Sequence, residues 1–241
     1  MTNRICLLLN TNDQPGVWLF NRLRKSLGAD IIMVSVDELI HASRFCCGLK
    51  NGKPFFSILL QRGLELNEHN FKAFLNRVQY LPLKHIQQFK KEDQAYVSQE
   101  LGAVFTFLFS IMPNQLFNKS TGTGLNGRQR SQLEWLVLAS KAGFDTPELL
   151  YEHQRFQYHD FSRHSTTDTV LFFNNRCFGK NMNEHSLLWK HCEQFGRLSG
   201  EKILELYVRE VDHSFQFLGA NLIPTFNGAG DDFLHELKTL L

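Results

Sequence analysis

The chain has 241 residues, of which 43% are hydrophobic and 21% charged, a composition typical of a globular protein that folds around a buried core. Its formal net charge is only +2 and the basic residues are scattered, so no basic stripe indicates a nucleic-acid partner. The longest apolar run, VFTFLFSIM at 104–112, is too short to span a membrane, and the amino terminus lacks the features of a secretory signal. We therefore expect a cytosolic (cytoplasmic) protein with no membrane and no nucleic-acid partner.

The first residues predict a strand, a helix and a second strand in succession. RICLLL at 4–9 is an apolar run followed by turn residues, Pro15 opens a segment with helical spacing that Gly28 closes, and residues 31–36 form another apolar run. This order predicts a βαβ unit, and therefore a parallel sheet at the start of the chain.

The next third contains one clear hairpin and one clear helix. Asn51-Gly52 separates two apolar segments within residues 43–60 and predicts a tight turn. Residues 71–80 fit a helix or a strand equally well. Residues 92–111 predict a helix that ends before Pro113. Its expected inner face consists of Val97, Leu101, Val104, Leu108 and Ile111.

A glycine-rich stretch, STGTGLNGRQR at 120–130, matches the G-x-G-x-x-G pattern of dinucleotide-binding loops. Such a loop needs a strand before it and a helix directly after it. Here only QLFN precedes the glycines, and a capping box formed by Ser131 and Glu134 would occupy the free amide groups of the next helix. We interpret the stretch as a connector, with an anion site at Arg128 and Arg130 as the alternative.

The helix that begins near Ser131 is expected to place Leu133, Leu136, Val137 and Ser140 on its inner side and to stop at Gly143. Residues 152–168 are polar without a period and predict a linker. That linker contains a group of titratable residues, His153, His159, Asp160 and His164, whose spacing suits no helical metal face. A solvated segment is the preferred interpretation of the His153–His164 region.

The last third predicts ordered structure again. It contains a second hairpin at Asn174-Asn175, a helix within 184–200 that ends at Gly200, two strands at 203–211 and 215–223, and a terminal helix at 231–241. The helix should turn Leu188, Cys192, Phe195 and Leu198 inward.

The cysteines number five, an odd count without a C-x-x-C pair, and we expect reduced thiols. Cys46 and Cys47 are adjacent on a predicted strand and would point to opposite faces, so packing is their expected role.

Several stretches together resemble a known family. FLNRVQYLPL (74–83), YVSQELGAVFTFLFS (96–110) and FNKSTGTGLNGRQRSQLEWLVLASKAGFDTP (117–147) resemble the amino-terminal region of ATP-grasp proteins, especially peptide-modifying carboxylate–amine ligases. ILELYVREVDHSFQFLGANLIPTF (203–226) resembles the closing strand pair of that family. The resemblance implies an α/β fold: a small amino-terminal α/β sheet domain at 1–114, joined to a reduced, truncated ATP-grasp-like α+β region at 115–241.

The sequence departs from the family pattern at its metal ligands. The metal-binding Glu of the last strand aligns with Gly219, the family's Asn is retained as Asn221, and Glu205 stands where the preceding strand carries its acid, with Glu210 and Asp212 as alternatives. The family places two nucleotide-binding lysines where this chain has none, between 150 and 170. ATP-grasp chemistry needs carboxylates for two Mg²⁺ ions and cations for the triphosphate. We therefore expect no cofactor, with ATP and Mg²⁺ bound at Glu205 and Asn221 as the alternative.

A further set of residues would face one cleft if the two end regions packed as in the proteins they resemble. The set, which would suit a carboxylate or a peptide backbone, consists of Asn76, Arg77, Arg128, Arg130 and Arg209. Scattered surface arginines are the alternative interpretation.

The functional hypothesis is a degenerate ATP-grasp-like protein without autonomous ligase activity that binds a peptide or a partner protein, in a peptide-modification pathway. Two alternatives stay open. One is an ATP-dependent carboxylate–amine or thiol ligase acting with a partner chain, and the other is an unrelated small-molecule enzyme that uses a Cys or a His.

Overall fold

The computed structural model describes residues 4–147, 149–152, 155–158, 167–179, 186–226 and 228–241. They form two compact units: residues 1–128 with 237–241, and residues 129–236. The sequence-based boundary follows residue 114, so the glycine-rich loop up to Arg128 falls within the first unit of the structure.

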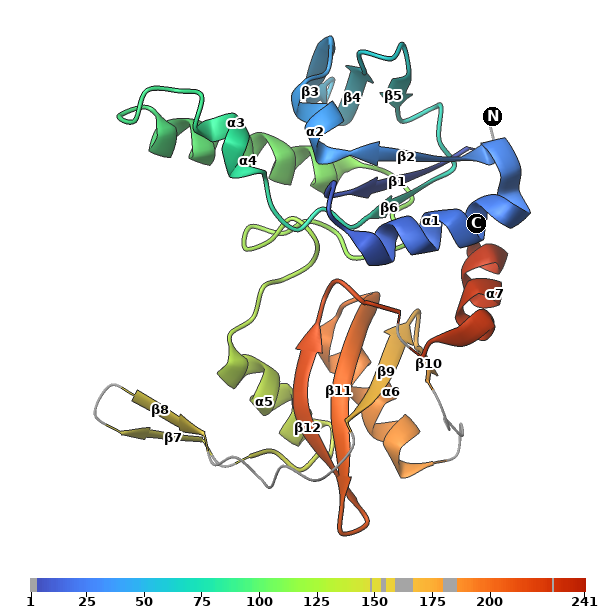
Figure 1. Ribbon diagram of the computed structural model, residues 1–241, viewed down its shortest axis with the longest axis vertical. Coiled ribbons are helices and arrows are strands. Elements are labelled where there is room, and N and C mark those ends of the chain that lie inside the picture. Colours follow the sequence, from blue (N-terminus) through green and yellow to red (C-terminus); the bar gives the residue numbers. More distant parts are fainter. Residues whose placement is uncertain (1–3, 148, 153–154, 159–166, 180–185, 227) are drawn as a thin grey trace. The chain divides into compact units, whose positions relative to one another are not determined.

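The first unit contains a parallel sheet with the strand order β2-β1-β6. β1 (Ile5–Leu9) and β2 (Ile31–Ser35) pair in parallel and are connected by α1 (Gln14–Leu27), as the sequence predicted. β6 (Ala73–Asn76) adds to the other side of β1 and is buried along its whole length. The ambiguous segment at 71–80 therefore supplies a strand (Figure 1).

The ends of α1 follow from local chemistry. Asp13 caps the start of the helix by accepting a hydrogen bond from the amide of Gly16 at 3.0 Å. Gly28 ends it with a φ of 59°, a backbone conformation that a residue with a Cβ rarely adopts. A short 3-10 helix, η1 (Gly28–Asp30), then leads into β2.

The predicted hairpin is present. β3 (Arg44–Lys50) pairs antiparallel with β4 (Lys53–Leu59), and the two turn residues, Asn51 and Gly52, both have positive φ. β5 (Glu65–Asn67) completes this second sheet. Between the two sheets in the chain, α2 (Val36–Ile40) begins with a full capping box made by Ser35 and Glu38.

The predicted helix at 92–111 is α4 (Gln94–Ile111), preceded by the short α3 (Leu83–Ile86). Its predicted inner face is partly confirmed, because Leu108 is buried and Leu101 and Ile111 pack against the core. Val104 is 36% exposed, and the unpredicted Phe105 and Phe109 are buried. The rings decide the orientation: Phe105 packs against Phe45 and Phe109, with centroid distances of 5.8 and 5.7 Å.

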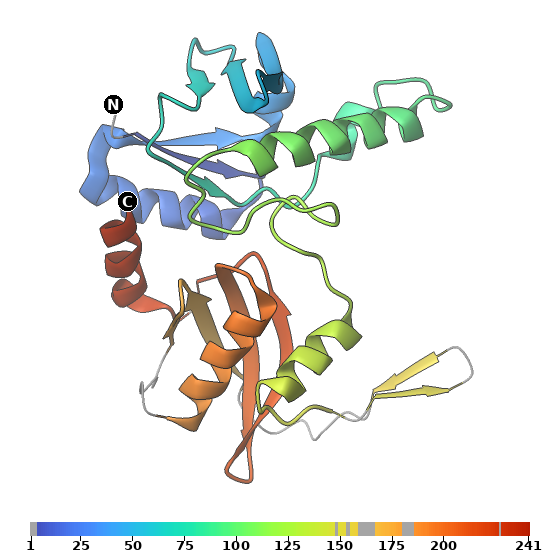
Figure 2. The same ribbon diagram turned by 180° about the vertical axis from the view of Figure 1, so that it is seen from behind.

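The second unit contains an antiparallel sheet in the order β10-β9-β11-β12. Its strands are β9 (Asp168–Phe173), β10 (Arg176–Phe178), β11 (Ile203–Val211) and β12 (Ser214–Asn221). The tight turn at Asn174-Asn175 was predicted, and a second one at Asp212-His213 joins the two predicted strands; both use residues with positive φ. One face of the sheet is covered by α5 (Gln132–Lys141) and α6 (Leu187–Ser199), which lie behind it in Figure 1 and in front of it in Figure 2.

The helix α5 has the predicted capping box at Ser131 and Glu134, but of its predicted inner face Leu136 alone is buried. The buried residues are Trp135, Leu136 and Ala139, whereas the predicted Leu133 and Val137 are 52% and 46% exposed. The physical reason is the indole of Trp135, which stacks on Phe195 of α6 with a centroid distance of 5.7 Å. This contact places the side of α5 that carries Trp135 against the core.

The predicted inner face of α6 is partly confirmed. Cys192 and Phe195 are buried and Leu188 packs against the core, but Leu198 is 43% exposed. The predicted stop at Gly200 is present as a left-handed cap.

The predicted linker at 152–168 is also corrected, because β7 (Leu149–Glu152) and β8 (Arg155–Tyr158) form an antiparallel pair there. The group His153, His159, Asp160 and His164 lies outside the described residues. The terminal helix was predicted and is α7 (Gly230–Leu240). Within the described ranges, no helix is both long and apolar enough to cross a membrane.

The contact between α6 and the sheet requires a glycine at position 196. A Cβ built on Gly196 would lie 2.2 Å from the ring of Phe172 on β9, a distance that no relaxed packing tolerates. Both residues are buried, so the helix backbone rests directly on the aromatic ring. Gly102 in α4 is different, since a Cβ there meets nothing within 4 Å.

These two helical glycines form a matched pair for a stability test. We predict that Gly196→Ala lowers the free energy of unfolding by about 1–3 kcal/mol, because the methyl group overpacks the interface with Phe172. Gly102→Ala should raise it by about 0.5–1 kcal/mol, because alanine has the higher helix propensity. Urea denaturation followed by circular dichroism measures both, and equal effects of the same sign would contradict the packing described.

Candidate functional site

The predicted metal pair lies on neighbouring strands. Glu205 of β11 and Asn221 of β12 are direct partners in the strand register, so their side chains share one face of the sheet. The residues that pack under α5 and α6, among them Leu204 and Leu206, belong to the opposite face. The structure therefore brings together the two residues that the sequence singled out.

The carboxylate of Glu205 is fully buried and is bound by donors from the protein itself. Thr225 donates its backbone amide at 3.1 Å and its hydroxyl at 2.9 Å, and Tyr207 donates its hydroxyl at 2.9 Å. Both carboxylate oxygens thus accept hydrogen bonds, as a buried charge requires.

Asn221 belongs to the same network. Its side-chain oxygen accepts the amide of Ile223 at 3.0 Å, and its side chain also hydrogen-bonds Tyr207. Burial is the main reason that the pKa of Tyr207 is raised; the hydrogen bond with Asn221 opposes the shift, and the charge of Glu205 adds to it. Tyr207 therefore stays protonated at neutral pH and remains a donor to Glu205.

Among the described residues, this arrangement offers few of the ligands that a magnesium pair needs. Mg²⁺ takes six oxygen ligands in a near-ideal octahedron, and it needs carboxylates whose lone pairs are available. Both oxygens of Glu205 and the oxygen of Asn221 already accept hydrogen bonds, and Gly219 has no side chain to offer. In the part of the chain that the structure describes, no three His, Cys, Asp or Glu side chains are grouped to hold a metal ion.

The two alternative acids lie elsewhere on the hairpin. Glu210 is exposed and pairs with Phe215, at an odd number of residues from Glu205, and so projects from the opposite face of β11. Asp212 forms the tight turn between β11 and β12. Neither lies beside Glu205 on its face of the sheet.

Two of the five predicted ligand-binding residues are buried in the first unit. Arg77 makes two hydrogen bonds to the carboxylate of Asp13, at 2.7 and 2.8 Å, and both side chains are almost fully buried. Asn76 donates to the carbonyl of Leu125 at 2.8 Å and accepts the amide of Val78. These contacts hold the end of β6 in place.

The other three differ in exposure and contacts. Arg130 binds Glu201 at 3.0 Å and the carbonyl of Ser199 at 2.6 Å, and its guanidinium lies 4.9 Å from the ring centre of Trp135. Arg209 is half-buried and donates to Gln216 at 2.5 Å, and Arg128 is exposed. Arg130 and Arg209 lie in the second unit and the other three in the first, and their common cleft stays a prediction.

The glycine-rich loop uses its own amides. Thr121 and Gly124 exchange backbone hydrogen bonds at 2.8 and 3.2 Å, and the amide of Gly127 donates to the carbonyl of Lys119 at 2.9 Å. The start of α5 is capped by Ser131. A phosphate cradle needs such amides pointing at the ligand, so the geometry fits a connector better than a nucleotide loop.

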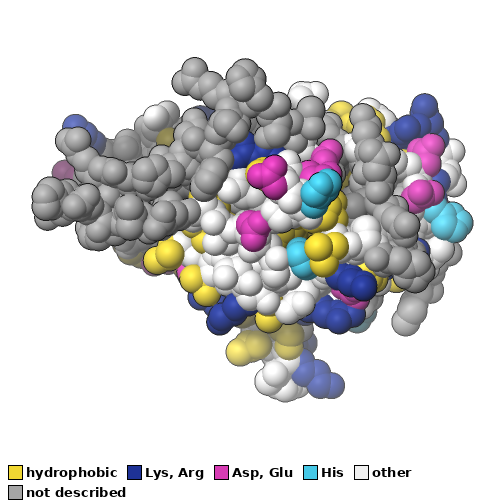
Figure 3. Space-filling model, turned by 90° about the horizontal axis from the view of Figure 1, so that it is seen from below, with side chains coloured by type: hydrophobic (Ala, Val, Ile, Leu, Met, Phe, Trp, Pro, Cys, Tyr) yellow, Lys and Arg dark blue, Asp and Glu magenta, His cyan; other side chains and the backbone are white. Residues whose placement is uncertain are grey.

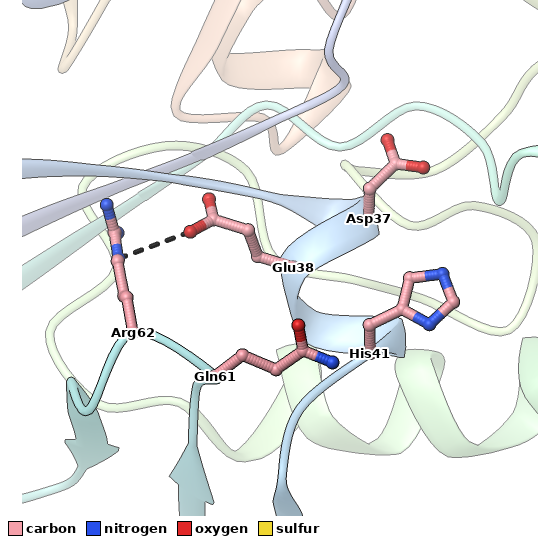
Figure 4. A pocket seen from close by; sticks show the side chains of 5 residues that line it. All are labelled: Asp37, Glu38, His41, Gln61 and Arg62. Atoms are coloured by element: carbon pink, nitrogen blue, oxygen red, sulfur yellow. Dashed lines mark ion pairs between the residues drawn. The ribbon is translucent and has the colours of Figure 1, made fainter.

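A cavity of about 360 Å³ in the first unit was missed by the sequence reasoning. Its lining is Asp37, Glu38, His41, Gln61 and Arg62, and Figure 4 shows Arg62 and Glu38 pointing toward each other, 3.2 Å apart. The cavity lies next to the carboxyl end of β2, a common place for ligands in parallel sheets. The predicted end of this strand was therefore the one signal in the sequence that could have indicated the cavity.

Asp37, one of the residues that line this cavity, makes several hydrogen bonds and ion pairs. It accepts hydrogen bonds from Thr11, from Lys84 at 2.6 Å and from His85 at 2.6 Å. Burial acts to raise the pKa of Asp37, but the hydrogen bonds from Lys84, Thr11 and His85 together outweigh it and lower the pKa.

On the face shown in Figure 3, acidic, basic and histidine side chains are interspersed, so the described residues of that face form no patch of one charge.

No protein-family model matches the chain, and no curated protein is similar to it. Solved structures do match. One is the macrocyclase MdnB from Microcystis aeruginosa MRC, with 15% identity, 98% of this chain and 97% of that chain covered, and a TM-score of 0.65. Another is the macrocyclase MdnC from the same organism, bound with precursor peptide MdnA, with 10% identity, 91% of each chain and a TM-score of 0.68.

A third match is the RiPP-associated ATP-grasp ligase of Chryseobacterium gregarium in complex with ADP and a leader and core peptide. It is 10% identical, the match covers 93% of this chain and 90% of that one, and the TM-score is 0.65. Identities this low establish the fold alone. The chain thus has the α/β fold of ATP-grasp ligases, which confirms the fold class inferred from the sequence.

The donors to Glu205 can be tested by removing one of them. We predict that Thr225→Val, which keeps the shape but removes the hydroxyl, lowers the free energy of unfolding by about 1–3 kcal/mol. The control is Thr169→Val on the neighbouring strand β9, expected to change it by less than about 0.5 kcal/mol. If chemical denaturation shows Thr225→Val to be neutral, Glu205 does not depend on this hydroxyl.

The lowered pKa of Asp37 predicts a pH dependence with a definite sign. A carboxylate whose pKa is lower in the folded state contributes stability above its unfolded pKa of about 3.9 and loses it as the pH falls through the folded value. The stability difference between the native chain and Asp37→Asn should therefore be constant at about pH 5–8 and shrink below about pH 4. Urea denaturation at a series of pH values measures it, and a difference that grows in acid would contradict the assignment.

Proposed function

We propose that this protein is an ATP-grasp-fold protein that binds a peptide or a partner protein and does not ligate on its own. The observation that supports the proposal most strongly is the state of Glu205. This carboxylate stands where the resemblance places a metal ligand, yet it is fully buried and bonded to Thr225 and Tyr207.

The burial of Glu205 bears on ligase activity through the need for Mg²⁺. A ligase of this class activates a carboxylate with ATP, and it needs Mg²⁺ to neutralise the triphosphate. To bind Mg²⁺, the buried Glu205 would have to be opened to the ion and its contacts with Thr225 and Tyr207 rearranged, and each buried donor left unsatisfied by that change costs about 1–3 kcal/mol. Position 219, a glycine, could not supply the second carboxylate. These costs support a binding role over autonomous catalysis.

The proposed ligand class comes from the proteins of similar fold. MdnC was solved with its precursor peptide, and the Chryseobacterium gregarium ligase with a leader and core peptide. Among the five residues that the sequence predicts for ligand binding, Arg128 is exposed and Arg209 is half-buried. Each of them is a proposed contact for a peptide carboxylate or backbone within its own unit, and the buried Asn76 and Arg77 hold the end of β6 in the first unit.

A second candidate is an ATP-dependent carboxylate–amine ligase that acts with a partner chain. The observation in its favour is that Glu205 and Asn221 lie directly opposite each other on one sheet face. In addition, a structure of the ATP-grasp ligase PsnB of similar fold, with a TM-score of 0.67, contains Mg and ADP. Under this alternative, ATP and Mg²⁺ would be the cofactors of the assembled complex.

Nucleotide binding separates the two candidates. We predict that isothermal titration of the whole chain with ATP and Mg²⁺ gives no heat of binding at micromolar concentrations, and that the melting temperature does not change. A ligand present at 100 times its dissociation constant would stabilise the folded state by about 2.7 kcal/mol, so a thermal shift is a sensitive readout.

The matched control is Glu205→Gln, which keeps the size of the side chain and removes its charge. Micromolar binding of ATP and Mg²⁺ by the native chain that is lost in Glu205→Gln would overturn the proposal and favour the ligase. Binding that persists unchanged in Glu205→Gln would place the nucleotide at another site, and the proposed lack of ATP use would also be wrong.

A further inference from the structure

Two cysteines that are distant in the sequence meet in the second unit. Cys177 lies on β10 and Cys192 on α6, and their thiols hydrogen-bond each other. Cys192 is fully buried in the aromatic core beneath the sheet, and Cys177 is partly buried at the edge of that core. Both thiols are free in the structure.

Only one of the two thiols can be reached from outside. Cys177 lines a cavity of about 440 Å³ between β10, the start of α6 and the start of α7. Trp189, Asp232 and His235 contribute to the same wall. Cys192 is not part of this lining and has no exposed surface. A small solute that enters the cavity therefore meets Cys177 first, with Cys192 behind it.

We propose that Cys177 and Cys192 form a reversible disulfide site, in which Cys177 reacts with a small disulfide such as glutathione disulfide and Cys192 resolves the product. In the first step the deprotonated sulfur of Cys177 attacks glutathione disulfide, which gives a mixed disulfide and releases one glutathione thiolate. In the second step Cys192 loses its proton and attacks the sulfur of Cys177, which forms the protein disulfide and releases the second glutathione. The protein loses two electrons, and glutathione disulfide gains them.

The environments of the two thiols suit these separate roles. Burial, with the neighbouring Cys177 adding to it, raises the pKa of Cys192, so that this thiol is a poor nucleophile toward anything in solution. The contact with Cys177 compensates for the raised pKa of Cys192, because two sulfurs within hydrogen-bonding distance react at a high effective concentration. Cys192 therefore reacts with a partner already attached to Cys177.

The other cysteines provide an internal comparison. Cys6 is fully buried, and burial raises its pKa strongly. Cys46 is exposed and Cys47 is half-buried, but they are consecutive residues of β3, where successive side chains point to opposite faces. Cys46 can react with an added reagent, but the strand geometry separates it from Cys47. The pair on β10 and α6 is thus the one in which two thiols meet.

The test uses the whole native chain in buffers of defined ratios of reduced to oxidised glutathione. After acid quenching and alkylation, proteolysis and mass spectrometry should find peptides linked through Cys177 and Cys192, and their fraction should follow a two-electron redox titration. Addition of reductant should reverse the link completely. If the linked peptides are absent even in fully oxidised glutathione, the proposal is wrong.

Variants separate the roles of the two sulfurs. Cys192→Ala should accumulate a glutathione adduct on Cys177 that is stable until reductant is added, and Cys177→Ser should leave Cys192 unmodified. Cys46→Ser is the control and should form the Cys177–Cys192 link to the same extent as the native chain. Modification of Cys192 in Cys177→Ser, or a link of either sulfur to Cys46, would overturn the proposal. The titration of the native chain needs no variant, and none of these results depends on whether the protein binds ATP.

Discussion

The carboxyl group of Glu205 has no access to water, and residues of the hairpin and of the segment after it supply its hydrogen bonds. Its carboxylate obtains one donor from its own strand, Tyr207, and two from Thr225, twenty residues later. The segment after β12 must therefore bring Thr225 back to Glu205. Asn221 contributes to this turn, because its side chain accepts the amide of Ile223 and hydrogen-bonds the hydroxyl of Tyr207. With these donors the buried carboxylate is satisfied within the protein itself.

The fold of this protein fixes where Glu205 and Asn221 lie, but it does not by itself fix what these side chains bind. The chain has the architecture of ATP-grasp ligases, and Glu205 and Asn221, the two residues of its predicted metal pair, lie opposite each other on neighbouring strands. In this chain both residues hydrogen-bond other groups of the protein itself. A fold supplies positions for side chains, and the function depends on what those side chains are free to bind.

Features encoded by neighbouring residues were predictable from the sequence, and features that depend on distant contacts were not. The β1–α1–β2 unit, the Asn51-Gly52 hairpin and the capping box at Ser131 each follow from signals within a few residues. The inner face of α5 does not, because it depends on the stacking of Trp135 on Phe195, sixty residues away in the chain. The cavity beside α2 and the donors from Thr225 to Glu205 were likewise invisible, since tertiary packing alone brings their parts together.

The most direct measurement of the central claim is the binding of Mn²⁺, a paramagnetic substitute for Mg²⁺, to the whole chain in the presence of ATP. The electron paramagnetic resonance signal of Mn²⁺–ATP should be unaffected by added protein, because the carboxylate of Glu205 is buried and already accepts hydrogen bonds from Thr225 and Tyr207. A signal that broadens with native protein and is restored by Glu205→Gln would contradict the account, since it would place the cation on Glu205.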